Sequence, residues 1–140
     1  MQNIGQKNPQ SLKKVSDHYW KSVLDPDQFN VLRLGGTEIP FTGVYNDHFK
    51  EGMYRCAACS VELFSSKEKY EAGCGWPTFW DSINKENLEF KEDNSLGVRR
   101  IEVRCKNCGS HLGHVFDDGP NPTGIRYCIN SVSLDFEPVK

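Results

Sequence analysis

Four of the six cysteines in this 140-residue sequence form two pairs with two residues between the members, Cys56/Cys59 and Cys105/Cys108. This spacing lets a tight turn aim both sulfurs at one ion, and two such turns complete a tetrahedral sulfur site. Four thiolates leave no position open for water, so such a metal is structural and not catalytic. We therefore expect one structural zinc ion per chain, bound by all four cysteines. Iron in place of zinc, or a separate redox role for one pair, are the alternatives.

Subtracting these ligands leaves Cys74 and Cys128. In the run from Arg126 to Asn130, strand alternation would place Arg126, Cys128 and Asn130 on one face. A thiol reacts as its thiolate, and a neighbouring guanidinium favours that form by lowering a pKa that is otherwise about 8.5. Cys128 is therefore the expected nucleophile. The competing interpretation is an exposed strand arginine beside an unreactive free cysteine.

Cys74 lies in a loop between two glycines, where little backbone bulk hinders its approach to another sulfur, so it suits a resolving thiol. The same loop carries Trp76 and Phe79, large aromatics that often form the wall of a ligand site when they occur in loops. The alternative is that both rings fill the core.

Two histidines, His111 and His114, follow Cys108 closely, so the metal-binding turn should position both imidazoles. A histidine can donate a proton to a developing oxyanion near neutral pH. Ligation of the metal by one of them, or a plain turn role, are the other possibilities.

The surrounding pattern predicts how these residues are held. Residues 16–36 show two short helices, the second with Asp25 as N-cap and Pro26 in the first turn. Residues 37–136 show short strand-like runs broken by turn residues, which indicates an all-β core. We expect a single domain over residues 1–140, with residues 1–15 flexible. The expected strands are 52–55, 88–92, 99–104, 114–116 and 126–134.

Composition limits the classes of function. The net charge is −2, which gives no broad attraction to nucleic acid or anionic lipid. No apolar run approaches the roughly 18 residues of a membrane helix. Residues 1–14 lack the apolar segment of a secretory signal, so we expect a cytoplasmic protein.

Several motifs taken together resemble the B-type methionine sulfoxide reductases. The resemblance implies a mainly β fold, with two antiparallel sheets in a barrel-like or tent-like core, short N-terminal helices and a structural zinc site. It also implies reduction of the R epimer of methionine sulfoxide, mainly in proteins. The motifs are residues 36–43, 73–79, 100–105, 111–120 and 126–131, in the order that the family has.

The resemblance also assigns roles. Cys128 is similar to the catalytic nucleophile, which becomes a sulfenic acid, and Cys74 to the resolving cysteine, which then forms a disulfide with it. Thioredoxin or a similar dithiol would reduce that disulfide. Trp76 resembles the wall that receives the substrate methyl group, and Phe116 is a further pocket candidate. The residues expected around the sulfoxide oxygen and the thiolate are His111, His114, Arg126 and Asn130.

Two other classes of protein compete with a reductase. A zinc-ribbon binding module could grip a partner with Trp76 and Phe79, but it leaves the two extra cysteines and the paired histidines unexplained. A zinc hydrolase would need an open coordination position, which four cysteines do not leave. As a reductase, the chain would act as a monomer on oxidised proteins.

Overall fold

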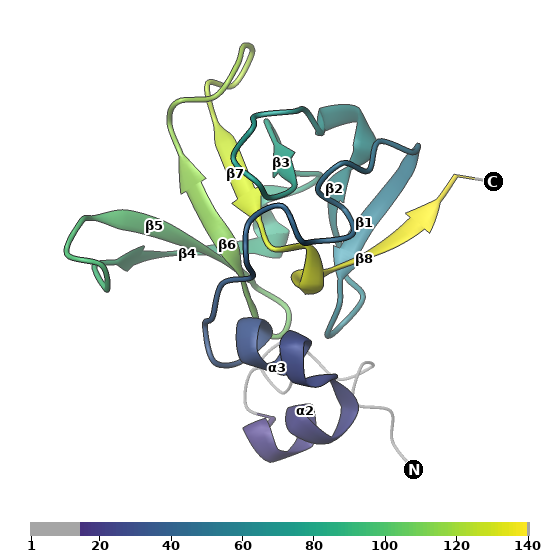
Figure 1. Cartoon of the computed structure of the whole chain (residues 1–140), viewed down its shortest axis with the longest axis vertical. Coiled ribbons are helices and arrows are strands. Elements are labelled where there is room, and N and C mark those ends of the chain that lie inside the picture. Colours follow the sequence, from purple (N-terminus) through teal and green to yellow (C-terminus); the bar gives the residue numbers. More distant parts are fainter. Residues whose placement is uncertain (1–14, 140) are drawn as a thin grey trace.

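The computed structural model of the chain describes residues 15–139 (Figure 1). Two short helices come first, α2 (Asp17–Val23) and α3 (Pro26–Leu32). The side chain of Asp25 accepts a hydrogen bond from the backbone of Gln28, whose side chain accepts one from the backbone of Asp25. This reciprocal cap and Pro26 in the first turn begin α3 where the sequence predicts it. Of the segment expected to be flexible, residues 1–14 lie outside the described residues, while Val15 packs against the core.

Eight strands form two antiparallel sheets, which confirms the expected mainly β fold. The three-stranded sheet has the order β2-β1-β8 and the five-stranded sheet the order β3-β7-β6-β5-β4. The strands are β1 (Gly52–Cys56), β2 (Glu62–Ser65), β3 (Thr78–Phe79), β4 (Leu88–Asp93), β5 (Arg100–Cys105), β6 (His111–Phe116), β7 (Arg126–Ile129) and β8 (Leu134–Pro138).

One predicted strand is wrong in its extent. Residues 126–134 do not form one strand, because the chain turns through a 3-10 helix at Ser131–Ser133 and enters the other sheet as β8. The Asn130 side chain donates to the carbonyl of Leu112 and accepts from the backbone of Glu38. These bonds fix Asn130 outside a strand ladder, as polar side chains often do where regular structure ends.

Besides β8, which the expected strand 126–134 reaches only at its first residue, two strands were missed, for different reasons. β3 has only two residues, too few to show a period. In β2 the neighbours Leu63 and Phe64 are both buried, because the pairing of β1 with β2 is irregular and the strict alternation is lost.

The core lies between the sheets and is rich in aromatic rings. Phe64 of the three-stranded sheet stacks on Phe79 of the other sheet at 4.5 Å, and Tyr54 and Tyr127 pack around this pair. Tyr127 and Ile129 of β7 are fully buried here, as the strand alternation predicts. Cys128, which lies between them in β7, therefore points to the other face of the five-stranded sheet.

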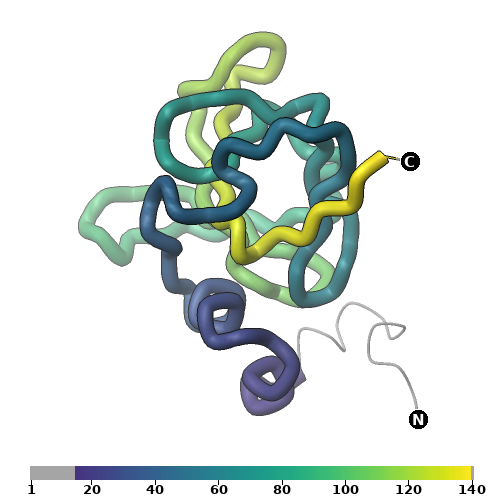
Figure 2. Tube along the Cα trace, turned by 45° about the vertical axis from the view of Figure 1, so that its right-hand side comes forward, coloured from purple at the N-terminus to yellow at the C-terminus, as the bar shows by residue number. Residues whose placement is uncertain are grey.

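The segment that follows α3 runs beside the C-terminal part of the chain (Figure 2). The backbone of Tyr45 donates to the Ser131 hydroxyl, and the Tyr45 hydroxyl accepts from the backbone of Phe136. This segment also carries Glu38, whose backbone nitrogen reaches Asn130, so it lies close to the end of β7. Among residues 15–139, no helix has both the length and the apolar character needed to cross a membrane.

Candidate active site and metal centre

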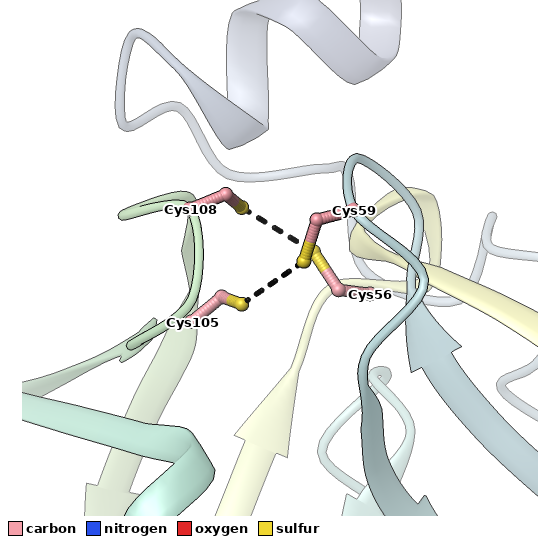
Figure 3. A group of neighbouring side chains, drawn as sticks. All are labelled: Cys56, Cys59, Cys105 and Cys108. Carbon is pink, nitrogen blue, oxygen red and sulfur yellow. Dashed lines mark hydrogen bonds between the residues drawn. The ribbon is translucent and has the colours of Figure 1, made fainter. Parts of the chain in front are cut away.

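The four paired cysteines meet at one point between the two sheets (Figure 3). Cys56 ends β1 and Cys105 ends β5, and each is followed by a tight turn that carries the second cysteine of its pair. The Sγ atoms lie within 4.8 Å of one another, with Cys56 3.7 Å from Cys108 and Cys59 3.5 Å from Cys105. These four residues could hold a metal ion, as their spacing predicts.

The turns themselves explain this convergence. The backbone of Ser60 donates to Cys56, and that of Gly109 donates to Cys105, so each turn closes on its first cysteine. Both closing residues have a left-handed backbone, with φ of 71° at Ser60 and 77° at Gly109. Three of the four cysteines are buried and Cys59 is half-buried. Four sulfur ligands would leave no coordination position open, which suits a structural role.

The remaining cysteines, Cys74 and Cys128, lie with their Sγ atoms 3.3 Å apart. Cys128 sits in β7 opposite Thr78 of β3 and His114 of β6. Cys74 belongs to the loop before β3, between Gly73 and Gly75, whose φ angles of 72° and 95° are rarely adopted by other residues. A disulfide needs the two sulfurs to close to about 2.05 Å, a short movement from this arrangement.

The contact between the two thiols shifts the pKa of each in opposite directions. The hydrogen bond from Cys128 lowers the pKa of Cys74 to about 5, and the Thr78 hydroxyl, 3.2 Å from the Cys74 sulfur, acts in the same direction. The same contact with Cys74, together with burial, raises the pKa of Cys128. The positive charge of Arg126 lowers the pKa of Cys128, as the sequence predicts, but the contact with Cys74 outweighs it. The contact between the two thiols therefore favours the charged form of Cys74 over that of Cys128.

Cys128 faces a small cavity of about 90 Å³ on the outer face of the five-stranded sheet. Four of the residues expected near the substrate line it beside Cys128, namely Trp76, His114, Phe116 and Asn130. The indole Nε1 of Trp76 donates to the carbonyl of Glu38 at 3.1 Å, which fixes the ring. The cavity has room for only a few water-sized groups, so it suits the end of a side chain and not a whole peptide.

His114 is held by a carboxylate from the neighbouring hairpin. Its Nε2 lies 2.7 Å from Asp93 Oδ2, which also pairs with Arg100 at 3.3 Å. The pKa of His114 is lowered, chiefly by burial, although the hydrogen bond to Asp93 acts in the opposite direction. His114 thus lines the cavity of Cys128 while its Nε2 is held by Asp93.

His111 lies outside this cavity. It is almost fully buried, its Nδ1 is 2.6 Å from Glu102 Oε2, and its ring centre is 5.6 Å from that of His114. Of the two histidines that the sequence left as equal candidates for a proton donor, the geometry favours His114.

Two other predicted site residues also lie outside the cavity. Phe79 is fully buried in the core, the position that the alternative interpretation gives it. The Arg126 guanidinium stacks 4.2 Å from the Phe116 ring and pairs with Asp118 at 2.8 Å. Arg126 thus lines a second cavity together with Cys74, while the Phe116 ring on which it stacks lines the cavity of Cys128.

Several residues of the site are not evident from the sequence pattern. Arg100 lines the cavity and Asp93 anchors His114, but neither was singled out. The alternation of Arg100, Glu102 and Arg104 with apolar neighbours in β5 was a signal that this strand has a polar face. Thr37, which also lines the cavity, lies in a loop and gave no such signal.

Comparison with known proteins places these features in context. The family model of the SelR domain matches residues 24–138. A protein of Leifsonia xyli named "Peptide methionine sulfoxide reductase MsrB" is 56% identical over 124 residues, covering 88% of this chain and 89% of the relative. A protein of the same name from Methanosarcina mazei is 59% identical over 121 residues, 86% of each chain. One from Methylibium petroleiphilum is 52% identical over 132 residues, 94% of this chain and 95% of the relative.

Proposed function

Because the chain belongs to the SelR-domain family, we propose that it is a peptide-methionine (R)-S-oxide reductase, which reduces methionine sulfoxide to methionine. One observation carries the assignment of residues. Cys128 and Cys74 lie 3.3 Å apart, and Cys128 faces a cavity that also holds a histidine and a tryptophan.

Substrate binding uses the small size of this cavity. The methyl sulfoxide end of the side chain enters it, and the methyl group rests against Trp76, with a sulfur–aromatic contact worth about 0.3–1.5 kcal/mol. Asn130 presents a polar side chain at the same cavity. The backbone of an oxidised protein stays outside, which suits a substrate that is part of a polypeptide.

The first chemical step needs the charge on Cys128. Cys74 takes the proton of Cys128, and Cys128 then attacks the sulfoxide sulfur as a thiolate. His114, in its imidazolium form, supplies a proton from Nδ1 to the oxygen while Nε2 is held by Asp93. Methionine leaves, and Cys128 is oxidised to a sulfenic acid.

The second step closes the pair. Cys74 attacks the sulfenic sulfur of Cys128, water leaves, and a Cys74–Cys128 disulfide forms. The distance of 3.3 Å between the sulfurs in the reduced pair supports Cys74 as the resolving residue. A dithiol such as thioredoxin then reduces the disulfide by exchange.

The metal in the four-cysteine centre is proposed to be zinc. A regular tetrahedron with metal–sulfur distances of about 2.3 Å has sulfur–sulfur edges of about 3.8 Å. The separations of 3.7 Å and 3.5 Å across the two cysteine pairs are close to this value. With four sulfur ligands the ion takes no part in the reaction, and it ties β1 to β5. A compartment that keeps thiols reduced, the cytoplasm, suits six free cysteines.

Two variants test the assignment. With blocked R and S epimers of methionine sulfoxide assayed separately, Cys128→Ser should give no product from either. Cys74→Ser should release about one methionine per chain from the R epimer and then stall, because the sulfenic acid cannot be resolved. Repeated turnover by Cys128→Ser, or a preference for the S epimer, would refute the proposal.

A further inference from the structure

The two sulfurs of the reactive pair open to different cavities. Cys128 lines the small cavity on the outer face of the five-stranded sheet. Cys74 lines a second, open cavity of about 580 Å³, formed with Tyr70, Ala72, Asp118, Gly119, Pro120 and Arg126. Within the described part of the chain, no residue lines both cavities. The two cysteines of the pair therefore line separate cavities.

The two cavities differ in what they can admit. The cavity of Cys128 holds about 90 Å³, enough for the end of one side chain. The cavity of Cys74 is several times larger and open, and its rim carries an exposed small residue, Ala72. A loop of another protein can enter this second cavity. The ion pair of Arg126 with Asp118 at the rim of the Cys74 cavity adds no net charge to that cavity.

Thiol–disulfide exchange proceeds by attack of a thiolate on one sulfur of a disulfide while the other sulfur leaves. An attacking group in the larger cavity meets Cys74, which lines it, whereas Cys128 does not line this cavity. The leaving thiolate is then Cys128, whose charge the nearby Arg126 guanidinium favours. This direction of attack returns Cys128 directly to the form that reduces the next substrate.

We propose that the open cavity at Cys74 is the docking site of the reductant, a protein dithiol whose reactive thiolate lies on a loop. This inference rests on the proposed function, because it requires a Cys74–Cys128 disulfide. The reductant thiolate forms a bond to Cys74 Sγ, the Cys74–Cys128 bond breaks, and its electron pair stays on Cys128. The second thiol of the reductant loses its proton and attacks the mixed disulfide, and Cys74 leaves as a thiolate. One dithiol is oxidised and one disulfide is reduced.

Trapping identifies the attacked sulfur. The wild-type chain is oxidised with methionine sulfoxide and mixed with a thioredoxin whose second active-site cysteine is replaced by serine. Peptide mapping without reductant should find the mixed disulfide on Cys74. A mixed disulfide on Cys128 would overturn the docking site and leave the proposed function intact. If methionine sulfoxide produces no Cys74–Cys128 disulfide, both proposals are wrong.

A pair of bulky substitutions separates the two approaches. Ala72→Trp should slow reduction of the oxidised chain by thioredoxin about tenfold or more, equivalent to about 1.4 kcal/mol. It should leave the first release of methionine by the reduced chain unchanged. Thr37→Trp, at the other cavity, should slow the first release of methionine and leave the reduction by thioredoxin unchanged.

Leu96→Trp is the matched control, because Leu96 is 71% exposed and lines neither cavity. It should change neither step. The metal content and circular dichroism of all three variants establish that they fold. Unchanged reduction by thioredoxin in a folded Ala72→Trp chain would overturn the docking site.

Discussion

Alkylation of Cys74 as a function of pH measures the pKa of this thiol and so tests the effect of its contact with Cys128. The pKa of Cys74 is lowered to about 5, chiefly by the hydrogen bond from Cys128. At pH 6 a thiol with that pKa is about 90% ionised, whereas an ordinary thiol with a pKa of about 8.5 is about 0.3% ionised. The ionised fraction is therefore about 300-fold higher than in an unperturbed cysteine.

The rate of alkylation rises less than the ionised fraction does. A less basic thiolate is a weaker nucleophile. With a Brønsted coefficient of about 0.4–0.5, a pKa lower by about 3.5 units reduces the rate constant of the thiolate by about 25- to 55-fold. The net gain at pH 6 is then only about 5- to 12-fold. The midpoint of the pH–rate profile is consequently a sharper measurement than the rate at one pH.

The assay is alkylation by iodoacetamide at a series of pH values, with peptide mapping to follow Cys74 alone. We expect a midpoint near 5 in the wild-type chain, because the thiolate is lost only as the pH falls through that pKa. Cys128→Ala removes the main donor, so its midpoint should move up toward that of an ordinary thiol. A wild-type midpoint of 8 or above would refute the lowered pKa of Cys74.

Three further predictions concern the site and the core. Asp93→Asn removes the carboxylate that raises the pKa of His114, so the loss of first-turnover activity with rising pH should shift to lower pH in a stopped-flow pH profile. Glu92→Gln, which breaks the exposed pair with Arg99 on the same hairpin, should leave that profile unchanged. Phe79→Ala should lower the free energy of unfolding in urea by about 3–5 kcal/mol, as expected for a buried aromatic side chain; a loss below 1 kcal/mol would contradict its place in the core. Cys56→Ser should lose the bound metal and the folded state together, measured by elemental analysis and circular dichroism, and a folded variant without metal would contradict a structural role.

The features that the sequence predicted well depend on local patterns. The cluster of four cysteines that could hold a metal follows from the spacing within each pair, and the inward side of β7 follows from alternation around Cys128. The features that it missed depend on residues distant in the chain. The break after β7 requires Leu112 and Glu38 as partners of Asn130, and the choice between the histidines requires Asp93.

For Phe79 and Arg126 the sequence pattern allowed two positions, and only the side-chain contacts in the structure decide between them. An aromatic residue in a loop motif suits a binding wall as well as a core, and only the stacking of Phe79 on Phe64 decides between them. Arg126 shares a face with Cys128, but its pairing with Asp118 draws it toward the other cysteine. Side-chain partners thus decide what strand alternation leaves open.

The order of strands in the smaller sheet has a consequence for biosynthesis. β1 lies between β2 and β8, so the hairpin of β1 and β2 emerges from the ribosome long before its second neighbour. Until Leu134–Pro138 is synthesised, one edge of β1 presents unpaired backbone groups, which are a template for association with other chains. A nascent chain stalled before residue 134 is therefore the form that we expect to need a chaperone.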